Sequence, residues 1–349
     1  MKLQVAVIGC GNVSAVHFPP IVESKAAELV AVCDIKPKRA QAAADKHRVP
    51  WFSHYERVLE LKPDLVHICT PHHTHAEIAV AAAERGIHVL TEKPMAINLA
   101  DADRMIRTAR KTKVKLGVIF QNRYNPASQA VYEAVQEGAL GELLGCRLFV
   151  TWCRLQHYYS LSDWKGTWSE EGGGALINQA IHTIDLMQWI MGDVASLQGS
   201  VANRAHPEIE VEDVAEARIL FKNGAVGSLY VCNYYTYDAD CFLEIHGTEG
   251  VARLEKERAI IRVKGRPERI IACEGAPGLG KPSWGASHKT QIEQFHRSVL
   301  NGSQVEIDGA SGRKALEIVR AIYYSSSLKG ESIPFPFQEP AGFNPPPLG

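Results

Sequence analysis

A short apolar run that ends in a glycine turn constrains the fold of this sequence more than any other feature. Residues 3–8 (LQVAVI) are mostly apolar, and the turn GCGNVS follows at residues 9–14. A helix-like stretch then extends to about residue 25, and a second apolar run, 29–33, ends at Asp34. Strand, glycine turn, helix, strand and acid is the order that a dinucleotide-binding fold requires.

The chemistry of this turn suits a dinucleotide. Glycine lets the backbone approach a pyrophosphate, and the start of the following helix offers N–H groups to it. A carboxylate at the end of the second strand accepts hydrogen bonds from ribose hydroxyls. Ser14 replaces the third glycine of the usual motif, so the match is loose. We predict that the cofactor contacts Gly9, Gly11, Asn12, Val13 and Asp34.

Asp34 also bears on which nucleotide binds. A carboxylate at this position accepts from both ribose hydroxyls and repels a 2′-phosphate, which favours NAD over NADP. Lys36, Lys38 and Arg39 follow at once and could neutralise such a phosphate. The alternative interpretation of these three cations is a solvated loop and helix start.

Strands and helices go on alternating as far as residue 120. We predict strands over 64–69, 87–91 and 115–120, and helices over 74–85 and 98–111. This alternation is typical of a parallel, doubly wound sheet, in which ligands bind beyond the carboxyl ends of the strands. Three loops lie there: 70–75 (TPHHTH), 92–94 (EKP) and 121–124 (QNRY). We expect further cofactor contacts from Thr70, Pro71, His72, His75, Glu92, Lys93 and Asn122.

Two of these loops raise separate questions. The histidines at 72, 73 and 75 suggest a metal, but consecutive histidines on one turn point apart and no cysteine or carboxylate cluster accompanies them, so we expect no metal. Lys93 directly follows a buried strand, where a lysine is costly without a function or a partner. Pro94 biases its backbone to an extended conformation. The alternative is a surface ion pair between Glu92 and Lys93.

The pattern changes after about residue 122. Strand-like runs separated by turn signals occupy 144–153, 195–202, 214–221, 225–233, 241–246, 251–254, 259–263 and 269–273. They predict an open, mainly antiparallel sheet with helices on one side, an α+β domain. Two helical runs follow, over 285–300 and 308–329. The last stretch, IPFPFQEPAGFNPPPLG, has six prolines, and we expect an extended arm or a disordered tail.

These patterns predict two domains and a tail. We expect an NAD(P)-binding Rossmann domain of α/β class over residues 1–121, a substrate-binding and oligomerisation domain over 122–333, and a proline-rich tail over 334–349, with the final helix able to pack back on the first domain. Antiparallel sheets of this kind usually bury their free face, so we expect a homodimer or homotetramer. The tail could reach across to a neighbouring subunit.

Composition excludes several classes of partner. The formal net charge of −1 provides no basic field for a nucleic acid or an anionic membrane. No apolar run is long enough for a membrane span, and the N-terminus has the character of a strand and not of a signal peptide. None of the eight cysteines forms a CxxC pair, so no disulfide framework is expected. We expect a cytoplasmic protein.

A second constellation lies in residues 172–192, GGGALINQAIHTIDLMQWIMG. Asn178, His182 and Asp185 interrupt an otherwise apolar helix at spacings of four and three residues, which places them on one helical face. If the start of this helix meets the first domain, that face looks toward Lys93. Alcohol dehydrogenation requires a base for the hydroxyl proton, a role that suits His182, and a donor to the alkoxide, a role that suits Lys93. The glycines would let a ligand approach. The alternative is a helix that makes only structural hydrogen bonds.

An aromatic segment, WCRLQHYYSLSDWKGTW (152–168), precedes this helix. Aromatic faces stack on sugar rings, and a lysine among them could reach a phosphate or carboxylate. The alternative is interface or core packing. We predict substrate contacts from Lys93, Arg123, Tyr124, Trp152, Tyr158, Lys165, Trp168, Asn178 and His182.

The glycine turn, EKP and the pattern GGGALxxQxxHxxDLxxW together resemble the Gfo/Idh/MocA oxidoreductases, over essentially the whole chain. The resemblance implies NAD(P)-linked oxidation or reduction of a sugar, sugar-derivative or inositol carbon. It also implies that Lys93 and His182 are catalytic. Asn178 stands where many members have an aspartate that pairs with the histidine, and we predict that it binds a substrate hydroxyl.

Two other functions remain open for such a sequence. Some relatives keep a tightly held NAD and use transient oxidation to cleave glycosides, which Lys93 and His182 would also suit. A non-catalytic nucleotide-binding sensor is the third possibility, and the presence of both residues argues against it.

Overall fold

The computed structural model describes residues 2–255, 258–272, 287–345 and 348 and divides into two units. The first unit contains residues 1–96 and 100–121 together with a later segment that ends at Arg313. The second contains Ile97–Leu99, residues 122–274 and the chain from Lys314 onward. One segment of the first unit ends at Gln121, near the predicted boundary, and a later part of the sequence joins the same unit. Cys273 and the predicted start of a helix at 285 lie outside the described residues.

Six parallel strands form the sheet of the first unit, in the order β3-β2-β1-β4-β5-β6. The strands are β1 (Leu3–Ile8), β2 (Ala27–Cys33), β3 (Trp51–Phe52), β4 (Leu65–Ile68), β5 (His88–Thr91) and β6 (Leu116–Val118). Every residue of β4 is buried, as in a parallel sheet covered on both faces. The predicted doubly wound sheet is confirmed.

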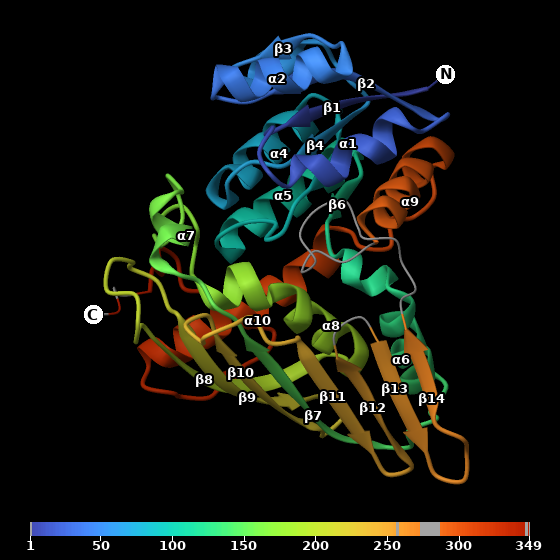
Figure 1. Cartoon of the computed structure of the whole chain (residues 1–349), viewed down its shortest axis with the longest axis vertical. Helices are drawn as coiled ribbons and strands as arrows, with labels where there is room; N and C mark the ends of the chain where they lie inside the picture. Colours follow the sequence, from blue (N-terminus) through green and yellow to red (C-terminus); the bar gives the residue numbers. More distant parts are fainter. Residues whose placement is uncertain (1, 256–257, 273–286, 346–347, 349) are drawn as a thin grey trace. The chain divides into compact units, whose positions relative to one another are not determined.

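The helices of this unit come from both ends of the sequence. They are α1 (Ser14–Val22), α2 (Pro37–His47), α3 (Tyr55–Glu60), η1 (His72–Thr74), α4 (His75–Glu84), α5 (Leu99–Thr112) and α9 (His288–Asn301). Pro37 occupies the first turn of α2, where its missing N–H costs nothing. α9 packs beside α1 (Figure 1), so a segment almost 270 residues later in the chain completes the core of the first unit.

Nine strands form the sheet of the second unit, in the order β14-β13-β12-β11-β7-β10-β9-β8-β15. Neighbours are antiparallel except β7 and β10, which run parallel, so the predicted, mainly antiparallel sheet is confirmed. The strands are β7 (Leu143–Thr151), β8 (Val194–Ala202), β9 (Val214–Phe221), β10 (Val226–Cys232), β11 (Phe242–Gly247), β12 (Gly250–Glu255), β13 (Arg258–Val263), β14 (Arg269–Ala272) and β15 (Ile333–Pro334).

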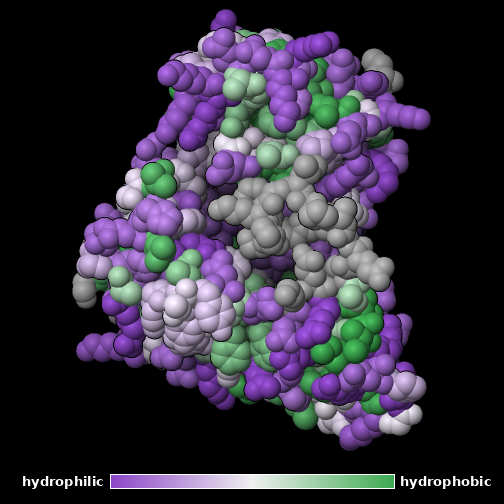
Figure 2. Space-filling view, viewed as in Figure 1, coloured by the Kyte–Doolittle hydropathy of each residue, from purple (hydrophilic) through white to green (hydrophobic). Residues whose placement is uncertain are grey.

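Helices of the second unit lie along one face of this sheet (Figure 1). α6 packs on β12, β13 and β14, and α8 packs on β7 and β11. Side chains that point away from these helices include Phe149 on β7, which is 39% exposed. Hydrophobic surface gathers where β13 and β14 lie (Figure 2). The helices and turns are η2 (Gln121–Tyr124), α6 (Pro126–Gln136), α7 (Gln156–Ser160), η3 (Ala175–Ala180), α8 (Ile181–Met191) and α10 (Gly309–Ser327).

The sequence predicts one α-helix within residues 172–192, but the structure does not contain a single α-helix there. Ala175–Ala180 is a π-helix and α8 begins only at Ile181. A π-turn contains more residues than an α-turn, so it shifts the face on which each side chain lies. The π-turn therefore alters the spacing between Asn178 and His182, which are partly exposed, whereas Asp185, three residues after His182 in α8, is buried.

Glycines 172–174 serve packing within the second unit. A Cβ on Gly172 would lie 2.5 Å from the Cβ of Ile97, and one on Gly173 would overlap the hydroxyl of Tyr323. A Cβ on Gly174 would overlap the carbonyl oxygen of Glu212. The expectation that these glycines admit a ligand to the helix start is corrected, because protein atoms already occupy that space.

Residues 334–343 of the proline-rich tail are ordered as part of the second unit. β15 pairs with β8, and the N–H of Phe335 donates to the carbonyl of Ala195 at 2.9 Å. The side chain of Phe337 is buried, and the carboxylate of Glu339 accepts from the buried guanidinium of Arg320. The sequence did not predict this order, because the contacts involve single side chains and produce no periodic pattern.

Phe337→Ala should therefore lower the free energy of unfolding by about 3 kcal/mol, because it leaves a cavity in a packed core. Urea unfolding followed by circular dichroism measures this loss, with Gln338→Ala as the control, since Gln338 is exposed. Equal stability of the two variants would show that the tail is not part of the folded core.

Candidate functional site

The first unit contains the predicted cofactor residues from Gly9 to Lys93, and the second contains Asn122 and the predicted substrate residues other than Lys93. Within the first unit, the glycine turn and Asp34 lie together. The N–H of Cys10 donates to Asp34 Oδ2 at 2.9 Å, and the N–H of Lys36 donates to Oδ1 at 2.8 Å. The carboxylate therefore holds the glycine turn against the end of β2, as the predicted dinucleotide site requires.

The two glycines of the turn have different roles. Gly9 has φ +95°, and a Cβ there would lie 2.5 Å from the carbonyl carbon of Cys69, so the protein itself requires glycine. A Cβ at Gly11 would meet no atom of the described chain within 4 Å. Internal packing does not explain glycine at position 11. Close approach of a bound pyrophosphate does explain it, so the turn fits a dinucleotide.

Paired substitutions separate these roles. Gly9→Ala should lower stability by about 2 kcal/mol through backbone strain and overlap with Cys69. Gly11→Ala should leave stability unchanged and weaken NAD binding about tenfold or more, because the new methyl group occupies ligand space. Thermal unfolding and calorimetric titration with NAD measure the two effects. Unchanged NAD affinity in Gly11→Ala would contradict a pyrophosphate contact at this turn.

His75 connects two of the loops at the carboxyl ends of the strands. Its ring nitrogens lie 2.8 Å from the carbonyl oxygens of Thr70 and Pro94, and the side chain is completely buried. Burial lowers the pKa of His75, although the two carbonyls act to raise it. The predicted direct contact of His75 with the cofactor is corrected, because the imidazole lies beneath the loops and holds them together.

Glu92 is buried and bonded to a histidine. Its Oε1 lies 2.9 Å from Nε2 of His17 and 3.8 Å from Nε2 of His288. Burial acts to raise the pKa of Glu92, but the hydrogen bond from His17 and the nearby positive charges hold it at about 2. Glu92 is therefore a carboxylate at neutral pH. The alternative of a simple surface pair between Glu92 and Lys93 is wrong.

Lys93 differs from its immediate neighbours. Among residues 90–96 it alone is not buried, and its N–H donates to Glu92 Oε2 at 3.3 Å. The peptide bond between Lys93 and Pro94 is cis. Buried polar groups thus hold this segment, while Lys93 itself is partly exposed.

Asn178 in the second unit has two hydrogen-bond acceptors. Its Nδ2 donates to Glu171 Oε1 at 2.5 Å and to the hydroxyl of Tyr158 at 3.2 Å. The Tyr158 hydroxyl also accepts from Nε2 of Gln179 at 3.2 Å. The Glu171 carboxylate explains an amide at position 178, because a carboxylate there would face another carboxylate.

Two buried carboxyls support this arrangement. Burial raises the pKa of Glu171 to about 7, although the N–H of Gly166 and the amide of Asn178 act to lower it. Burial likewise raises the pKa of Glu212 to about 7, against donors that include the N–H groups of Gly174 and Leu176. The glycine turn before η3 is thus tied to groups that titrate near neutral pH.

Two of the predicted substrate residues are internal. The guanidinium of Arg123 makes a bidentate ion pair with Asp185, at 2.6 and 2.7 Å, and Arg123 is only 4% exposed. Trp168 is also buried and meets Tyr323 edge-on, with 5.1 Å between ring centroids. For both residues the packing alternative replaces substrate contact, because their recognition groups already face the protein.

Other predicted substrate residues remain at the surface. The ammonium of Lys165 lies 3.5 Å from the ring centroid of Tyr158, and the guanidinium of Arg154 lies 4.8 Å from that of Trp152. Trp152 donates through Nε1 to the carbonyl of Ala239 at 3.1 Å. Cations held over aromatic faces form a surface that can both stack on a sugar ring and attract an anionic group.

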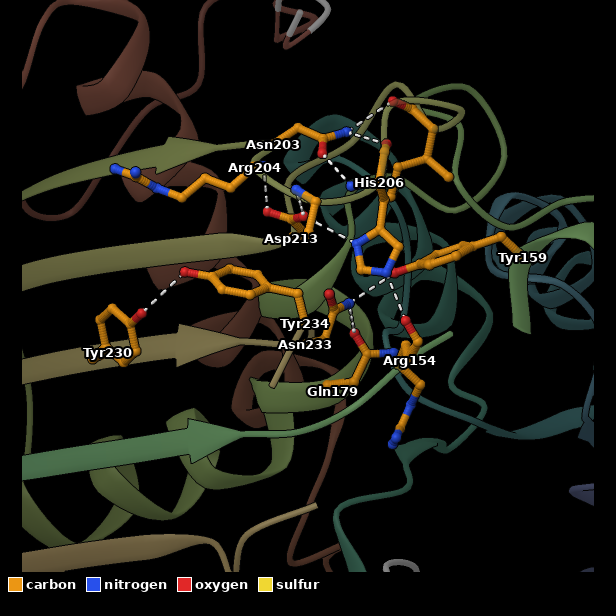
Figure 3. Close-up of polar contacts among 12 residues, drawn as sticks. Arg154, Tyr159, Gln179, Asn203, Arg204, His206, Asp213, Tyr230, Asn233 and Tyr234 are labelled. Atoms are coloured by element: carbon orange, nitrogen blue, oxygen red, sulfur yellow. Dashed lines mark hydrogen bonds and ion pairs between the residues drawn. The ribbon is translucent and has the colours of Figure 1, made fainter. Parts of the chain in front are cut away.

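Figure 3 shows the polar contacts that hold this aromatic segment. His206 lies between Asp213 Oδ2, at 3.0 Å, and the carbonyl oxygen of Arg154, at 2.6 Å. The bond to Asp213 raises the pKa of His206, against the effect of burial. Nδ2 of Asn233 donates to the hydroxyl of Tyr159 at 2.7 Å. These supports escaped sequence reasoning, as did Glu171 and His17, because their spacings match no motif.

Asn178→Asp should destabilise the protein by about 2 kcal/mol at pH 8, because two carboxylates would then face each other. The loss should shrink at pH 6, since a carboxyl pair that shares a proton titrates above the unfolded value of about 4.3. Urea unfolding at both pH values measures it, with exposed Asn301→Asp as the control. A loss that does not depend on pH would contradict the Asn178–Glu171 contact.

No helix in the described part of the chain is long and apolar enough to cross a membrane, and no group of three or more described His, Cys, Asp or Glu side chains is arranged to hold a metal ion. The seven described cysteines are free thiols.

Comparison with known proteins agrees with these observations. Residues 3–120 match the sequence model of the GFO/IDH/MocA oxidoreductase family with an NAD-binding Rossmann fold, and residues 128–253 match that of the GFO/IDH/MocA C-terminal domain. D-glucoside 3-dehydrogenase of Escherichia coli (strain K12) is 36% identical over 195 residues, which cover 54% of each chain, so this match spans about half of that relative. D-apiose dehydrogenase of Rhizobium rhizogenes is 28% identical and covers 93% of this chain and 96% of its own.

A solved structure shows the same fold. The WlbA dehydrogenase from Bordetella pertussis, in complex with NADH and UDP-GlcNAcA, is 30% identical to this chain. The match covers 97% of this chain and 100% of that one, with a TM-score of 0.86.

Proposed function

Because this chain belongs to the GFO/IDH/MocA family of NAD-binding oxidoreductases, we propose that it is a dehydrogenase that oxidises a secondary alcohol of a sugar, sugar derivative or inositol. The observation that carries the proposal is the exposure of the predicted catalytic residues. Of residues 171–188, only Asn178 and His182 are not buried, and Lys93 is the only such residue of 90–96. In both segments, therefore, only the polar side chains proposed to act in catalysis are partly exposed, and the residues around them are buried.

NAD, when bound, supplies the hydride acceptor. The glycine turn at Gly9 and Gly11 binds its pyrophosphate, with Asn12 and Val13 at the start of α1. Asp34 accepts from the ribose hydroxyls and disfavours a 2′-phosphate, so NAD is preferred over NADP.

Different residues of this chain carry out the separate acid–base steps. Lys93 donates to the substrate hydroxyl oxygen and stabilises the negative charge that develops on it. His182 accepts the hydroxyl proton and returns it in the reverse direction. Nδ2 of Asn178 donates to Glu171 and Tyr158, and its amide oxygen accepts from a neighbouring substrate hydroxyl.

The substrate class rests on the aromatic segment and on the relatives. Partly exposed rings at Trp152 and Tyr158, with Lys165 over one of them, suit a sugar ring. The relatives named above act on a glucoside or on apiose, or were crystallised with a nucleotide sugar acid.

The purified protein should reduce NAD with at least one member of a panel of inositols, free sugars, glycosides and nucleotide sugars. Lys93→Ala and His182→Ala should each lower kcat/KM by about 100-fold or more. If the two residues act on one hydroxyl, the double variant should lose much less than the product of the single losses. Lys111→Ala is the control.

Three results would redirect the proposal. Glycoside cleavage with no net NADH, and with NAD released only on denaturation, would favour the hydrolytic alternative. Full activity in both single variants would exclude the assigned roles. Reduction of NADP at the greater rate would overturn the cofactor preference.

We also propose that the uncovered face of the second sheet joins copies of this chain as a homodimer or homotetramer. Phe149 and Phe242 lie on this face with 5.7 Å between ring centroids, and the guanidinium groups of Arg147 and Arg253 lie over Phe242. A location in the cytoplasm stays a prediction.

Phe149→Glu should convert the oligomer to monomer in light scattering after gel filtration, because it buries an unpaired charge at the interface. Leu161→Glu is the control, since Leu161 is an exposed apolar residue outside the sheet. The same mass for both variants would place any interface elsewhere.

A further inference from the structure

Four buried histidines from three elements of the first unit converge on Glu92. His17 comes from α1, His67 from β4, and His288 and His296 from α9. All four are at most 5% exposed. Neither the dinucleotide site nor the proposed acid–base chemistry uses them, and so many buried imidazoles require an explanation, since each has a donor and an acceptor to satisfy.

Three of the histidines form one continuous hydrogen-bonded chain. Nε2 of His17 lies 2.9 Å from Glu92 Oε1, and Nδ1 of His17 lies 3.0 Å from Nδ1 of His67. Nε2 of His67 lies 3.0 Å from Nε2 of His296. Each link joins two nitrogens or a nitrogen and an oxygen, so one atom of each pair must carry the proton.

The carboxylate determines the first proton of the chain. An ionised Glu92 only accepts, so Nε2 of His17 carries a proton and donates. When this is the only proton on the His17 ring, Nδ1 has a lone pair, which requires a proton on Nδ1 of His67. Neutral His67 in turn has a lone pair on Nε2, which requires a proton on Nε2 of His296.

Burial keeps the outer members of the chain neutral. It lowers the pKa of His67 well below its ordinary value and that of His296 to about 4, and the neighbouring imidazoles act in the same direction. With these tautomers, a second proton on His17 or on His67 would place two N–H groups against each other at 3.0 Å. Two arrangements satisfy every link, and they differ in which nitrogen of His67 carries the proton. The arrangement with a singly protonated His17 ends at Nδ1 of His296, where the described residues offer no donor.

We propose that His67 and His296 are positioning residues that hold His17 as a donor to Glu92 and thereby keep the carboxylate beside Lys93 ionised and oriented. The assignment rests on the proposed function in one respect, namely that Lys93 contacts the substrate. The carboxylate accepts from the N–H of Lys93 through Oε2, so its charge and its orientation both act on the segment that presents the lysine.

Other groups face Glu92 and bear on its titration. His288 on α9 approaches it at 3.8 Å, Lys93 lies beside it in the same loop, and His75 on α4 and Cys69 after β4 interact with its charge. None of them donates to Oε1 within hydrogen-bond distance as His17 does. Loss of the chain therefore leaves His17 free to move its proton to Nδ1, which would turn a lone pair toward the carboxylate and favour protonation of Glu92.

The first test needs no substrate. Selective ¹⁵N labelling of histidine in the full chain, with assignment by single histidine variants, reports which ring nitrogen of each neutral imidazole is protonated. We expect protons on Nε2 of His17, Nδ1 of His67 and Nε2 of His296. A proton on Nε2 of His67 would reverse the direction of the chain and overturn the proposal, whatever the protein's activity.

The second test uses matched pairs of variants. An asparagine at 67 keeps a donor near the position of Nδ1 and a glutamine at 296 keeps one near Nε2, whereas phenylalanine removes both. His67→Phe and His296→Phe should lower kcat/KM about tenfold, most strongly at the acid end of the pH profile, because Glu92 loses its oriented donor. His67→Asn and His296→Gln should restore the wild-type profile.

Several controls make the outcome decisive. His54→Phe, at an exposed position of the same unit, should leave the profile unchanged. If the phenylalanine variants lower stability but keep the wild-type pH profile, the chain is structural only and the proposal is wrong. If they do not fold, the profiles of the asparagine and glutamine variants and the wild-type ¹⁵N measurement decide. Loss of turnover in Lys93→Ala tests the proposed function separately.

Discussion

The ionised carboxylate of Glu92 is the interaction on which the arrangement of the first unit depends. A charge without water must be met by donors, and here the donor is an imidazole from α1 that is itself bonded to β4 and, through it, to α9. The hydrogen bonds therefore join the glycine-turn helix, the central sheet and a helix from the far end of the sequence. Removal of any member leaves a buried polar group unsatisfied, which is why such networks hold one conformation.

Buried carboxyl groups that accept hydrogen bonds also support the second unit, where their partners are different. Glu171 and Glu212 are buried beneath the segment that leads into η3, where they accept from backbone N–H groups and from Asn178. Arg123 and Asp185 form a paired charge inside the unit. In each case, buried carboxyl groups and ion pairs hold the backbone segment that carries the partly exposed functional side chains. Rigid support of this kind is what preorganised catalysis requires.

Sequence reasoning succeeded where the signal is local. The apolar runs, the glycine turn and the acid after β2 predicted a parallel sheet, and the alternating runs after residue 122 predicted a mainly antiparallel one. It failed for Arg123 and Trp168, whose residue types suit both recognition and packing, because burial alone distinguishes the two. It left the tail as either an extended arm or a disordered segment, since a proline-rich stretch lacks the periodicity that reveals how it packs.

The sequence by itself determined the order of the elements, the dinucleotide fingerprint and the candidate catalytic residues, because turn chemistry, hydrophobic period and short motifs depend on neighbouring residues. Only the tertiary structure decided which polar groups meet. His17 and His67 are 50 residues apart, His17 and Glu92 are 75 apart, and His67 and His296 are 229 apart. No local pattern encodes such contacts, because they exist only after the strands and helices pack and exclude water from the groups between them.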